Sequence, residues 1–467
     1  MIAMTLAEVA SAVDGRLIVG SATSTDVVNG QAHTDSREVA EGDIFFARRG
    51  EETDGHRFTQ AAETAGARLL IVEQQVEASV AQIVVDDSTL ALGRLAKANV
   101  RRAKDVTDLT VVGVTGSNGK TTTKNLIAAM AEQVGPTVAN IRSFNNEVGG
   151  PLTMLRVSSD TKTLVAEMGA NAEGDIAKLA DMARPNIGVV LTVGLAHAGG
   201  FGDLPTTFRT KSEMVSELAE RDVAVLNRDD PWVSKMAEVT RARIVWFGQH
   251  SDSDVRASEI DGDARGTSFN LHASGDTRAV RFQVLGEHHV TNALAAAAVG
   301  LELGLSLDDV VASLEQTTLA APGRMEVLSC RDGITVINDA YNANPDSMSA
   351  ALKTLARVAK PGGRTVAVLG AMGELGDQSG EQHDRLGLQV VRLGITELIV
   401  VGSEARRLHI SSINEGSWDG ESVFFAEKDD ALQYLVQTAR PDDTILVKAS
   451  NAAGLGILAQ QLEEALA

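Results

Sequence analysis

The sequence predicts an α/β protein of three domains, each made of strands that alternate with helices. The chain has 467 residues, about three times the usual length of one domain. Its hydrophobic residues (44%) are mainly Ala, Val and Leu, and aromatic residues make up only 3%, which favours helices packed on parallel strands over a sandwich or barrel. We expect a smaller N-terminal α/β domain (residues 1–107), a central doubly wound domain with a mostly parallel sheet (108–321) and a Rossmann-like C-terminal domain (322–467).

The N-terminal region contains short apolar runs separated by turns. Residues 69–72 and 83–85 are its clearest strand candidates, because each is a brief apolar run between polar segments. The charged stretch 101–105 then predicts a boundary with the next region.

The central region repeats a strand, a loop and a helix. Residues 109–114 form an apolar, β-branched run that suits a buried parallel strand, and residues 122–134 have helical spacing. This alternation implies right-handed crossovers and a doubly wound sheet. Further strands are expected at residues 163–166, 187–193 and 223–226, with turns at 185–186 and 227–231.

The C-terminal region begins at the break marked by Pro322 and Gly323 and repeats the same alternation. Each expected strand is followed by a segment with helical spacing, which predicts another α/β domain. The expected strands are residues 335–338, 365–369, 397–401 and 444–447.

The overall composition limits the classes of protein. A net charge of −21 argues against sequence-independent binding of nucleic acid, which needs Lys and Arg to replace counterions. Cys330 is the only cysteine, so neither an intramolecular disulfide nor a cysteine-based zinc site is expected. Residues 1–17 lack the positively charged start of a signal peptide, and no run approaches the roughly 20 apolar residues that cross a bilayer. We expect a cytoplasmic monomer that inserts into no membrane.

A glycine-rich loop lies between the expected strand 109–114 and the expected helix 122–134. Its glycines let backbone N–H groups turn toward one anion, and the start of the helix adds a positive dipole end. Lys120 can reach the β- and γ-phosphates of a nucleotide, and Thr121 offers a hydroxyl to Mg²⁺. The alternative, a glycine turn with an unrelated lysine, is disfavoured by the strand, loop and helix context. We expect ATP to bind at Thr115, Gly116, Ser117, Asn118, Gly119, Lys120, Thr121 and Thr122.

The first glycine of this loop departs from the general phosphate-loop pattern. The pattern G-x-x-x-x-G-K-T places a glycine at position 114, where this chain has Val114, and the glycine stands at position 113 instead. The form T-G-x-N-G-K-T-T is characteristic of the Mur ligase family, which includes the folylpolyglutamate synthetases.

Stretches from about Asp35 to Asn451 resemble further motifs of the same family. Residues 143–153 resemble its N-x-N-N-x-x-G-x-P-x-T segment, and Glu167 opens a stretch similar to the E-M-G-A-N sequence of its MurF-type branch. Residues 339–345 are close to the D-x-Y-N-A-N-P of that branch. Other similar stretches are residues 196–202, 210–213, 286–293, 322–326 and 369–376.

The resemblance implies an ATP-dependent carbon–nitrogen ligase of peptidoglycan and cell wall synthesis. Its substrates would be ATP, UDP-N-acetylmuramoyl-tripeptide (UDP-MurNAc-tripeptide) and D-alanyl-D-alanine. The γ-phosphoryl group would pass to the terminal carboxylate of the tripeptide, and the amine of the dipeptide would attack the acyl phosphate, with release of ADP and phosphate. Because negative groups must meet first, the site has to neutralise charge.

The resemblance also implies the catalytic and metal-binding residues. Lys120 would neutralise phosphate charge, Thr121 and Glu167 would bind one Mg²⁺, and His197 a second. Lys211 falls where the family has a carbamylated lysine, an anion that can support a metal and that forms from a neutral amine with a lowered pKa. Taken alone, Glu167 would be a surface carboxylate, His197 a loop histidine and Lys211 a solvated lysine. Their places in the family's stretches favour the functional roles.

Further nucleotide contacts are expected from three parts of the chain. The resemblance places Asn146 near the nucleotide, Asn292 at the adenine and Arg324 at the phosphates. The run before Pro345 also suits a capped turn, and both roles can hold together. The C-terminal side of the nucleotide site is expected to consist of Asp339, Tyr341, Asn342 and Asn344.

Substrate contacts are expected in the N-terminal region. Ser36 and Arg37 lie in a stretch that resembles a UDP-binding loop of the family, where they can present a hydroxyl and a guanidinium to the diphosphate. Asp54 and His56 resemble a second UDP-binding loop, and for His56 a purely structural loop role is an equal alternative.

Near residue 450 the sequence departs from the motifs of the family. Lys448 is a candidate contact for the carboxylate of the dipeptide. Ala449 and Asn451 stand where the family usually has the glycine and arginine of V-K-G-S-R, and Ala371 where an acidic residue is common. These departures leave open how the dipeptide is held.

Two other functions are compatible with parts of the sequence. Another ligase of the family could add an amino acid such as a diamino acid or glutamate, but residues 167–171 and 339–345 disfavour it. A P-loop switch or motor ATPase would act on a macromolecular partner without forming an amide, and the full-length series of ligase motifs disfavours that class.

Overall fold

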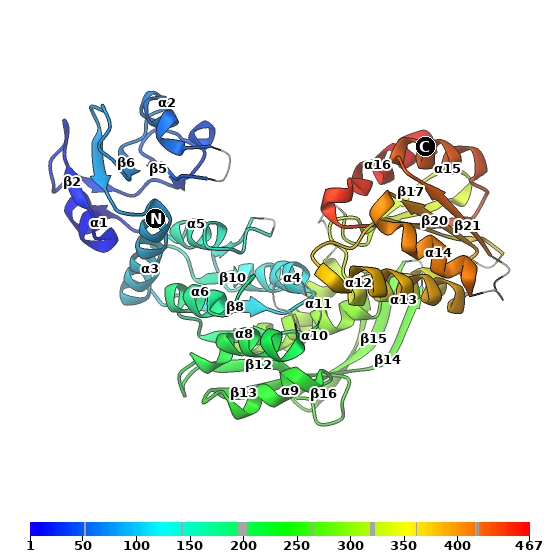
Figure 1. The fold of residues 1–467 in the computed structure, drawn as a ribbon. Helices are drawn as coiled ribbons and strands as arrows, with labels where there is room; N and C mark the ends of the chain where they lie inside the picture. The colour runs from blue at the N-terminus through cyan, green and yellow to red at the C-terminus, as the bar shows by residue number, and fades with distance from the viewer. Residues whose placement is uncertain are drawn as a thin grey trace.

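Three large sheets succeed one another along the chain, one in each third of the sequence (Figure 1). The computed structural model describes residues 1–50, 53–141, 143–194, 203–263, 265–317, 323–360, 362–415, 418 and 420–467. In Figure 1 the blue N-terminal part and the red C-terminal part lie on opposite sides of the molecule, joined by the central part in cyan and green. The predicted α/β class with mostly parallel sheets is confirmed. Among the helices described, none has both the length and the apolar character that a membrane span requires.

The N-terminal sheet has five strands in the order β2-β7-β6-β5-β4. Strands β4 to β7 are parallel neighbours, and β2 pairs antiparallel with β7 at one edge. The strand predicted at 69–72 is confirmed as β6, whereas the one predicted at 83–85 lies at 81–84. The elements are β1 (Met4–Thr5), α1 (Leu6–Val13), β2 (Arg16–Ile18), β3 (Val27–Val28), β4 (Ala32–His33), β5 (Ile44–Phe46), α2 (Thr59–Thr64), β6 (Leu69–Val72) and β7 (Ala81–Val84), with short 3-10 helices at Ser36–Glu38 and Gly55–Phe58.

The central sheet has nine strands in the order β16-β15-β14-β13-β12-β11-β8-β10-β9. Neighbours from β14 to β9 are parallel, whereas β14, β15 and β16 form an antiparallel meander that the strand and helix alternation did not predict. The predicted strands are confirmed to within two residues, except that the one predicted at 187–193 ends at Val190. The elements are β8 (Thr110–Thr115), α4 (Lys120–Glu132), β9 (Thr137–Ala139), α5 (Gly149–Leu155), β10 (Thr163–Glu167), α6 (Asp175–Ala183), β11 (Ile187–Val190), α8 (Leu204–Ser216), β12 (Val223–Asn227), α9 (Pro231–Ser234), β13 (Arg243–Gly248), β14 (Val255–Asp263), β15 (Gly266–Ala273), β16 (Asp276–Phe282), α10 (His288–Glu302) and α11 (Leu307–Gln316).

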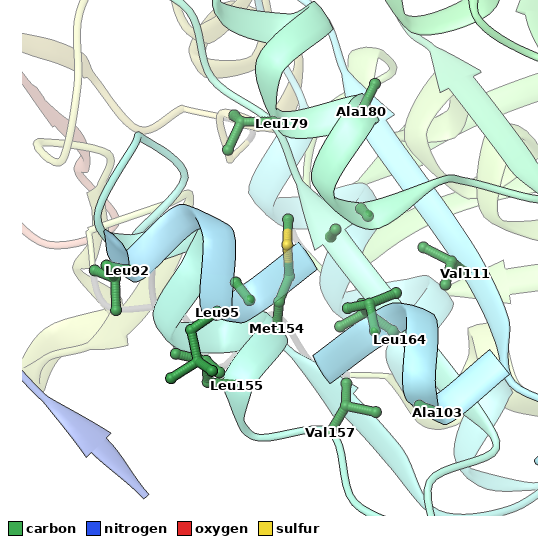
Figure 2. Close-up of a cluster of buried hydrophobic side chains, with 14 of the residues drawn as sticks. Leu92, Leu95, Ala103, Val111, Met154, Leu155, Val157, Leu164, Leu179 and Ala180 are labelled. Carbon is green, nitrogen blue, oxygen red and sulfur yellow. The ribbon is translucent and has the colours of Figure 1, made fainter. Parts of the chain in front are cut away.

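Helix α3 (Ser88–Val106) joins the N-terminal sheet to the central one. Its apolar face belongs to one cluster with α5 and α6, in which Leu95 of α3 lies near Leu155 of α5 (Figure 2). The charged run 101–105, predicted as a boundary, forms the last turns of this helix, between the strands of the two sheets: Ala103 is buried and the charges lie mainly on the solvent side. The charges mark the polar face of an amphipathic helix.

The C-terminal sheet has six strands in the order β17-β18-β22-β19-β20-β21. All neighbours are parallel except β17, which pairs antiparallel with β18. The four predicted strands are confirmed, and β17 and β21 extend the sheet at its two edges. The elements are β17 (Glu326–Ser329), β18 (Thr335–Asn338), α12 (Pro345–Val358), β19 (Thr365–Leu369), α13 (Ser379–Arg392), β20 (Glu397–Val401), α14 (Arg406–Asn414), β21 (Glu421–Phe425), α15 (Lys428–Thr438), β22 (Thr444–Lys448) and α16 (Leu455–Ala465).

Candidate active site

The phosphate loop joins the end of β8 to the first turn of α4, as its sequence pattern predicts. Gly119, which precedes the helix, has φ 83°, a left-handed conformation that glycine adopts readily. A Cβ at this position would meet Asn292 Oδ1 at 2.2 Å, so the residue must also be small. Lys120 Nζ donates to Gly116 O at 2.7 Å and folds back onto the loop. The lysine and the positive end of α4 therefore lie together.

The glycine at position 113 has a packing role that is separate from the phosphate loop. It lies within β8, in register with Gly188 of β11. A Cβ on Gly113 would meet Met214 Sδ at 2.8 Å, and one on Gly188 would meet Leu218 Cδ1 at 3.0 Å. The two glycines therefore allow α8 and the residues that follow it to approach the sheet closely, which gives Gly113 a role outside the phosphate loop.

The loop forms one wall of a cavity of about 470 Å³. The end of β10, the start of α10 and the C-terminal region form the other walls, so residues far apart in the sequence meet here. The predicted site residues that line this cavity are Ser117, Asn118, Gly119, Lys120, Thr121, Thr122, Glu167, Asn292, Arg324, Asp339, Tyr341, Asn342, Asn344 and Lys448.

Glu167 ends β10 in the wall of the cavity, and its side chain is only half paired. Its Oε1 accepts hydrogen bonds from Thr121 Oγ1 at 3.2 Å and from Asn145 Nδ2 at 2.7 Å. Its Oε2 is buried and has no hydrogen-bond partner among the described residues. An unpartnered buried carboxylate oxygen is costly and rare, so it indicates a missing ligand. An oxygen-only pair of Glu167 and Thr121 suits Mg²⁺.

The metal ligand set is not complete in the part of the chain that the structure describes. No three His, Cys, Asp or Glu side chains gather there as a metal cluster. His197, predicted as a ligand, lies outside the described residues, as do its neighbours at 195–202 and Pro322 of the predicted break. Further ligands would have to come from a nucleotide, from water or from those residues.

Positive side chains face Glu167 across the cavity. Burial lowers the pKa of Lys120, the charge of Glu167 opposes this, and Arg324 adds to the lowering. Bound phosphate would add negative charge and favour the protonated lysine. The cavity therefore suits an anionic ligand that arrives with its own cation.

Side chains of the C-terminal region reach the phosphate loop directly. Asn344 Nδ2 donates to Asn118 Oδ1 at 2.7 Å, and the hydroxyls of Ser143 and Tyr341 are hydrogen-bonded. Asn344 also caps α12, so the predicted capped turn and its place in the cavity hold together. The guanidinium of Arg324 lies 4.2 Å from the centre of the Tyr341 ring, which fixes the plane of that ring in the cavity wall.

Lys448, predicted to contact the dipeptide, is engaged inside the same wall. Its Nζ lies 2.6 Å from Asp339 Oδ2 and donates to Asn342 O at 2.9 Å. Asp339 Oδ1 in turn accepts from Met325 N at 3.1 Å. This pair connects the ends of β18 and β22 to the segment that enters the C-terminal sheet, on the side where the predicted nucleotide residues lie.

Two cavity histidines were missed by the sequence reasoning. The rings of His288 and His289 lie 4.2 Å apart at the start of α10. Burial lowers the pKa of His288 to about 4, with Asp339 opposing, and lowers that of His289 well below its ordinary value. Both rings are therefore neutral at pH 7. The sequence signal that could have identified them is a pair of adjacent histidines at the start of an otherwise Ala-rich helix.

Asn292 orients His289. Its Oδ1 accepts from Thr123 Oγ1 at 3.3 Å, so its Nδ2 is directed at His289 Nδ1, 3.1 Å away. The ring proton is therefore assigned to Nε2, which is buried and has no partner among the described residues. Asn292, predicted to touch the adenine, uses both polar atoms within the protein, and His289 presents the unpartnered N–H.

Lys211 is buried on α8, so the solvated-lysine alternative is wrong. Its exposed fraction is 1%, although it does not line the cavity. Burial lowers its pKa to about 7, the positive charge of Lys120 adds to this, and Glu213 opposes it. Glu213 is itself held by the backbone N–H groups of Gly174 and Ala177 at the start of α6. A neutral amine is thus well populated at pH 7.

Of the two adjacent asparagines in the predicted segment, Asn145 and not Asn146 lies in the cavity. Asn146 is exposed, and its Oδ1 accepts from Gly149 N at 3.0 Å at the start of α5. Thr115 also stands back from the cavity, with its hydroxyl donating to Met168 O at 2.9 Å. Sequence spacing alone does not show which of two neighbouring side chains points inward.

Ser36 and Arg37 lie in a short 3-10 helix of the N-terminal region, away from the cavity lining. The guanidinium of Arg37 pairs with Asp35, whose pKa it holds at about 2, and its side chain is 87% exposed. An exposed guanidinium of this kind remains accessible to an anionic ligand.

His56 has a structural role in the same region. Its Nδ1 lies 2.6 Å from Asp54 Oδ1, and its Nε2 accepts from Glu73 N at 2.8 Å. Both ring nitrogens are occupied, so the ring holds its loop against the end of β6. Of the two roles weighed for His56, this geometry favours the structural one.

Comparisons with known proteins cover nearly the whole chain. Family models match in succession: the Mur ligase family catalytic domain at residues 32–100, the Mur ligase middle domain at 114–300 and the Mur ligase glutamate ligase domain at 323–451. The UDP-N-acetylmuramoyl-tripeptide–D-alanyl-D-alanine ligase of Mycobacterium tuberculosis (strain H37Rv) is 40% identical over 501 aligned residues, which are 99% of this chain and 98% of that protein.

Solved structures agree with the sequence comparison. A crystal structure of MurF from Acinetobacter baumannii has a TM-score of 0.89 at 32% identity and covers 99% of both chains. The structure of a MurF ligase from Thermotoga maritima in complex with ADP has a TM-score of 0.83 at 28% identity, covering 94% of this chain and 98% of that one. The resemblance seen in the motifs is confirmed.

Proposed function

The chain belongs to the Mur ligase family, and from this premise we infer that it is an ATP-dependent ligase that adds D-alanyl-D-alanine to UDP-MurNAc-tripeptide in peptidoglycan synthesis. The observation that carries this inference is a cavity in which the phosphate loop, the half-paired Glu167 and the Asp339–Lys448 pair meet. The similarity to ligases of this name extends over 99% of the chain.

We propose that the reaction passes through an acyl phosphate. A carboxylate oxygen of the tripeptide attacks the γ-phosphorus of ATP, and the bond from that phosphorus to the β–γ bridging oxygen breaks, so that ADP leaves. The dipeptide amine then attacks the acyl carbon, the carbon–oxygen bond to phosphate breaks, and the amine gives up a proton. Lys120, Arg324 and the start of α4 provide the positive charge that lets the anionic reactants meet.

Thr121 and Glu167 fit a magnesium ion, which would neutralise phosphate charge when bound. The support is the unpartnered Glu167 Oε2 beside the Thr121 hydroxyl. A second ion is proposed at His197 with the help of Lys211. His289 Nε2–H is proposed to donate to the nucleotide, with Asn292 holding its ring in place.

Lys211 is proposed to carry a carbamate. A neutral amine adds to CO2, forming an N–C bond and releasing one proton, and the product is an anion at the end of the same side chain. Burial and a pKa of about 7 favour the reactive neutral amine. The anion would also relieve the repulsion between Lys211 and Lys120.

Each region is proposed to hold one substrate. Residues 1–107 would bind the UDP end through exposed groups such as Arg37, residues 108–321 would bind ATP, and residues 322–467 would hold the dipeptide and complete the ATP site. Ala449, a departure from the family, is buried close to Gly370, which leaves room for its methyl group. We further propose a monomer in the cytoplasm, where ATP and nucleotide-linked precursors are found.

Phosphate release tests the proposed function. Release is expected only when ATP, UDP-MurNAc-tripeptide and D-alanyl-D-alanine are all present, and Lys120→Ala should lower the turnover number about 100- to 1000-fold because a charge that stabilises the transition state is lost. A panel of UDP-peptides and dipeptides, with the amide product measured by mass spectrometry, identifies the substrates. Equal release with either acceptor substrate omitted would contradict the assignment.

A further inference from the structure

Lys124 is a buried lysine for which the function described above has no use. It lies one turn beyond Lys120 on α4 and is 3% exposed. Burial lowers its pKa, the charge of Glu167 opposes this, and Arg324 adds to the lowering. Burying an ammonium group is costly, and an apolar side chain of similar length would suit a helix interior better. The lysine is therefore expected to have a specific role.

Lys124 holds the start of a turn that leads to the cavity. Its Nζ donates to Asn140 O at 2.8 Å, directly after β9. Asn140 is itself buried, and its Nδ2 donates to Phe144 O at 2.6 Å, which spans the turn. Asn140 Oδ1 accepts from Glu167 N at 2.7 Å. One lysine and one asparagine thus connect the helix of the phosphate loop to the backbone of Glu167.

The far end of the same turn contacts the carboxylate of Glu167. Asn145 Nδ2 donates to Glu167 Oε1 at 2.7 Å, and Asn145 O accepts from Gly169 N at 2.9 Å. Glu167 is thereby held at its backbone by Asn140 and at one carboxylate oxygen by Asn145. These contacts fix the rotation of the carboxylate and leave Oε2 as the oxygen available to a ligand.

We propose that Lys124 and Asn140 are positioning residues that hold Phe144 and Asn145 in place, so that Glu167 presents Oε2 to the cation accompanying the nucleotide. The proposal rests on the proposed function, in which Glu167 and Thr121 hold Mg²⁺. Neither Lys124 nor Asn140 touches the nucleotide in this scheme, because neither lines the cavity. Their loss should weaken the contribution of Mg²⁺ to nucleotide binding and leave the contribution of the phosphate loop unchanged.

Calorimetric titration with ADP, in Mg²⁺ and in EDTA, separates these two contributions. For Lys124→Met, which keeps the length but removes the charge and the donor, we expect ADP affinity in EDTA within about twofold of the parent. The increase in affinity that Mg²⁺ provides should fall about 10- to 100-fold, as for other groups that orient a metal ligand. Electron paramagnetic resonance of Mn²⁺ bound with ADP should show the same loss.

Two further variants keep the test decisive. Asn140→Ala should show the same selective loss, because it removes the contacts to Glu167 N and Phe144 O. Lys104→Met is the matched control: Lys104 is a partly buried lysine on α3 that donates to Arg184 O and Asn186 Oδ1, away from the cavity, and it should behave like the parent. If Lys124→Met unfolds at a clearly lower temperature than the parent, the same titrations with Lys124→Gln and Asn140→Ala decide whether the positioning role holds.

The outcomes distinguish this proposal from the proposed function. An unchanged Mg²⁺ contribution in both Lys124→Met and Asn140→Ala would overturn the positioning role. An equal loss of ADP affinity in EDTA and in Mg²⁺ would also overturn it, because a general distortion of the loop would then be responsible. Failure of the parent to form an amide, with the selective Mg²⁺ effect intact, would count against the ligase assignment and not against the positioning role.

Discussion

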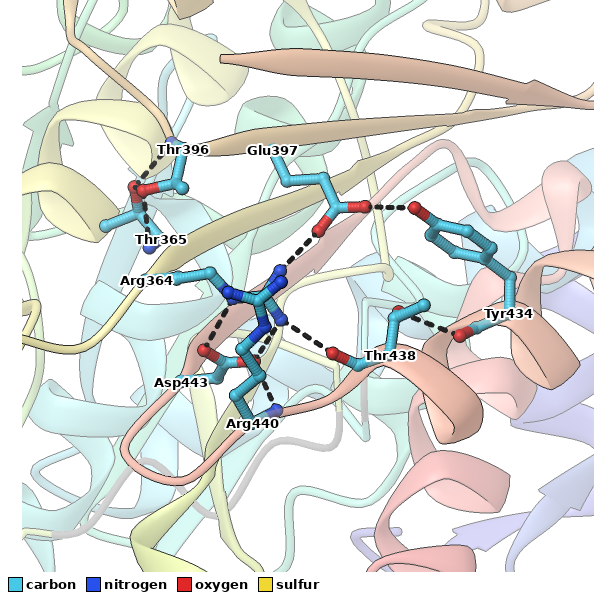
Figure 3. A network of polar contacts seen from close by, with 8 residues as sticks. All are labelled: Arg364, Thr365, Thr396, Glu397, Tyr434, Thr438, Arg440 and Asp443. Atoms are coloured by element: carbon cyan, nitrogen blue, oxygen red, sulfur yellow. Dashed lines mark hydrogen bonds and ion pairs between the residues drawn. The ribbon is translucent and has the colours of Figure 1, made fainter. Parts of the chain in front are cut away.

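Two groups of buried charge in this molecule differ in how completely their carboxylates are paired. At the amino ends of three C-terminal strands, Arg364 contacts Glu397 Oε2 at 2.9 Å and Asp443 Oδ2 at 2.7 Å, and Tyr434 donates to Glu397 Oε1 at 2.6 Å (Figure 3). Every carboxylate oxygen of that group has a partner. At the end of β10, Glu167 leaves Oε2 without one among the described residues.

The difference separates a charge cluster that stabilises the fold from one that leaves a carboxylate oxygen available to a ligand. The Arg364 group is closed on itself: hydrogen bonding to Glu397 raises the pKa of Tyr434 to about 12, so the phenol stays protonated and remains a donor. Sites in parallel sheets form at the carboxyl ends of strands, which is where Glu167 and Lys448 lie. The Arg364 group lies at the opposite, amino ends of its strands.

The largest effect is expected from breaking the closed group. Arg364→Met should lower the free energy of unfolding by about 3–5 kcal/mol, because Glu397 and Asp443 remain buried without their counter-charge. Urea denaturation followed by tryptophan fluorescence measures this, and ADP affinity should stay near the parent's. The matched control is Arg357→Met, whose exposed ion pairs with Asp261 and Glu287 are expected to contribute less than about 1 kcal/mol. Equal losses of the free energy of unfolding in the two variants would show that the Arg364 group contributes no more to stability than exposed ion pairs do.

The site around Glu167 should instead respond to pH through Lys211, which is buried on α8 and interacts electrostatically with Lys120. Its pKa of about 7 lies below that of an ordinary lysine, so the neutral amine that accepts CO2 predominates above pH 7 and is lost as the pH falls through 7. Ligase turnover should therefore decline below about pH 7 and be partly restored by added bicarbonate. Lys211→Ala should lose about 100-fold in turnover and regain part of it with formate or acetate. Absence of any rescue, with the protein folded, would argue against the carbamate.

The smallest effect is expected at His289 Nε2, another buried atom of this site that has no partner among the described residues. His289→Leu should weaken ADP binding about tenfold, since one hydrogen bond to the nucleotide is lost. The same change should alter the free energy of unfolding by less than about 2 kcal/mol, because it removes the acceptor of Asn292 Nδ2 but also removes Nε2–H, a buried donor with no partner among the described residues. His289→Asn, which keeps an N–H donor, should bind ADP more tightly than His289→Leu. Calorimetry measures the affinity for ADP, and urea denaturation measures the free energy of unfolding. A large loss of stability with unchanged affinity for ADP would show that His289 stabilises the fold and does not bind the nucleotide.

Much of the fold could be predicted because its determinants are local. Short apolar runs before helical segments located β6, β8, β10, β18, β19, β20 and β22, and turn residues marked their ends. The meander β14 to β16 has the alternating burial of half-exposed antiparallel strands, which a search for continuous apolar runs does not detect. The charged run 101–105 did not show that it belongs to a helix, because the apolar residues that share its helix are spread over earlier turns of α3.

By itself, the sequence determined the phosphate loop, the order of the three α/β regions and, through the series of ligase motifs, the family. These depend on residues that are neighbours in the chain, whose spacing a strand, a turn or a helix converts directly into position. Only the tertiary structure decided that Asn145 and not Asn146 faces Glu167, that His289 Nε2 has no partner among the described residues, and that Lys124 donates to Asn140 O. Such assignments depend on packing between segments such as Asn118 and Asn344, which touch although 226 positions separate them. Which atoms remain unpaired is known only once every other contact has formed.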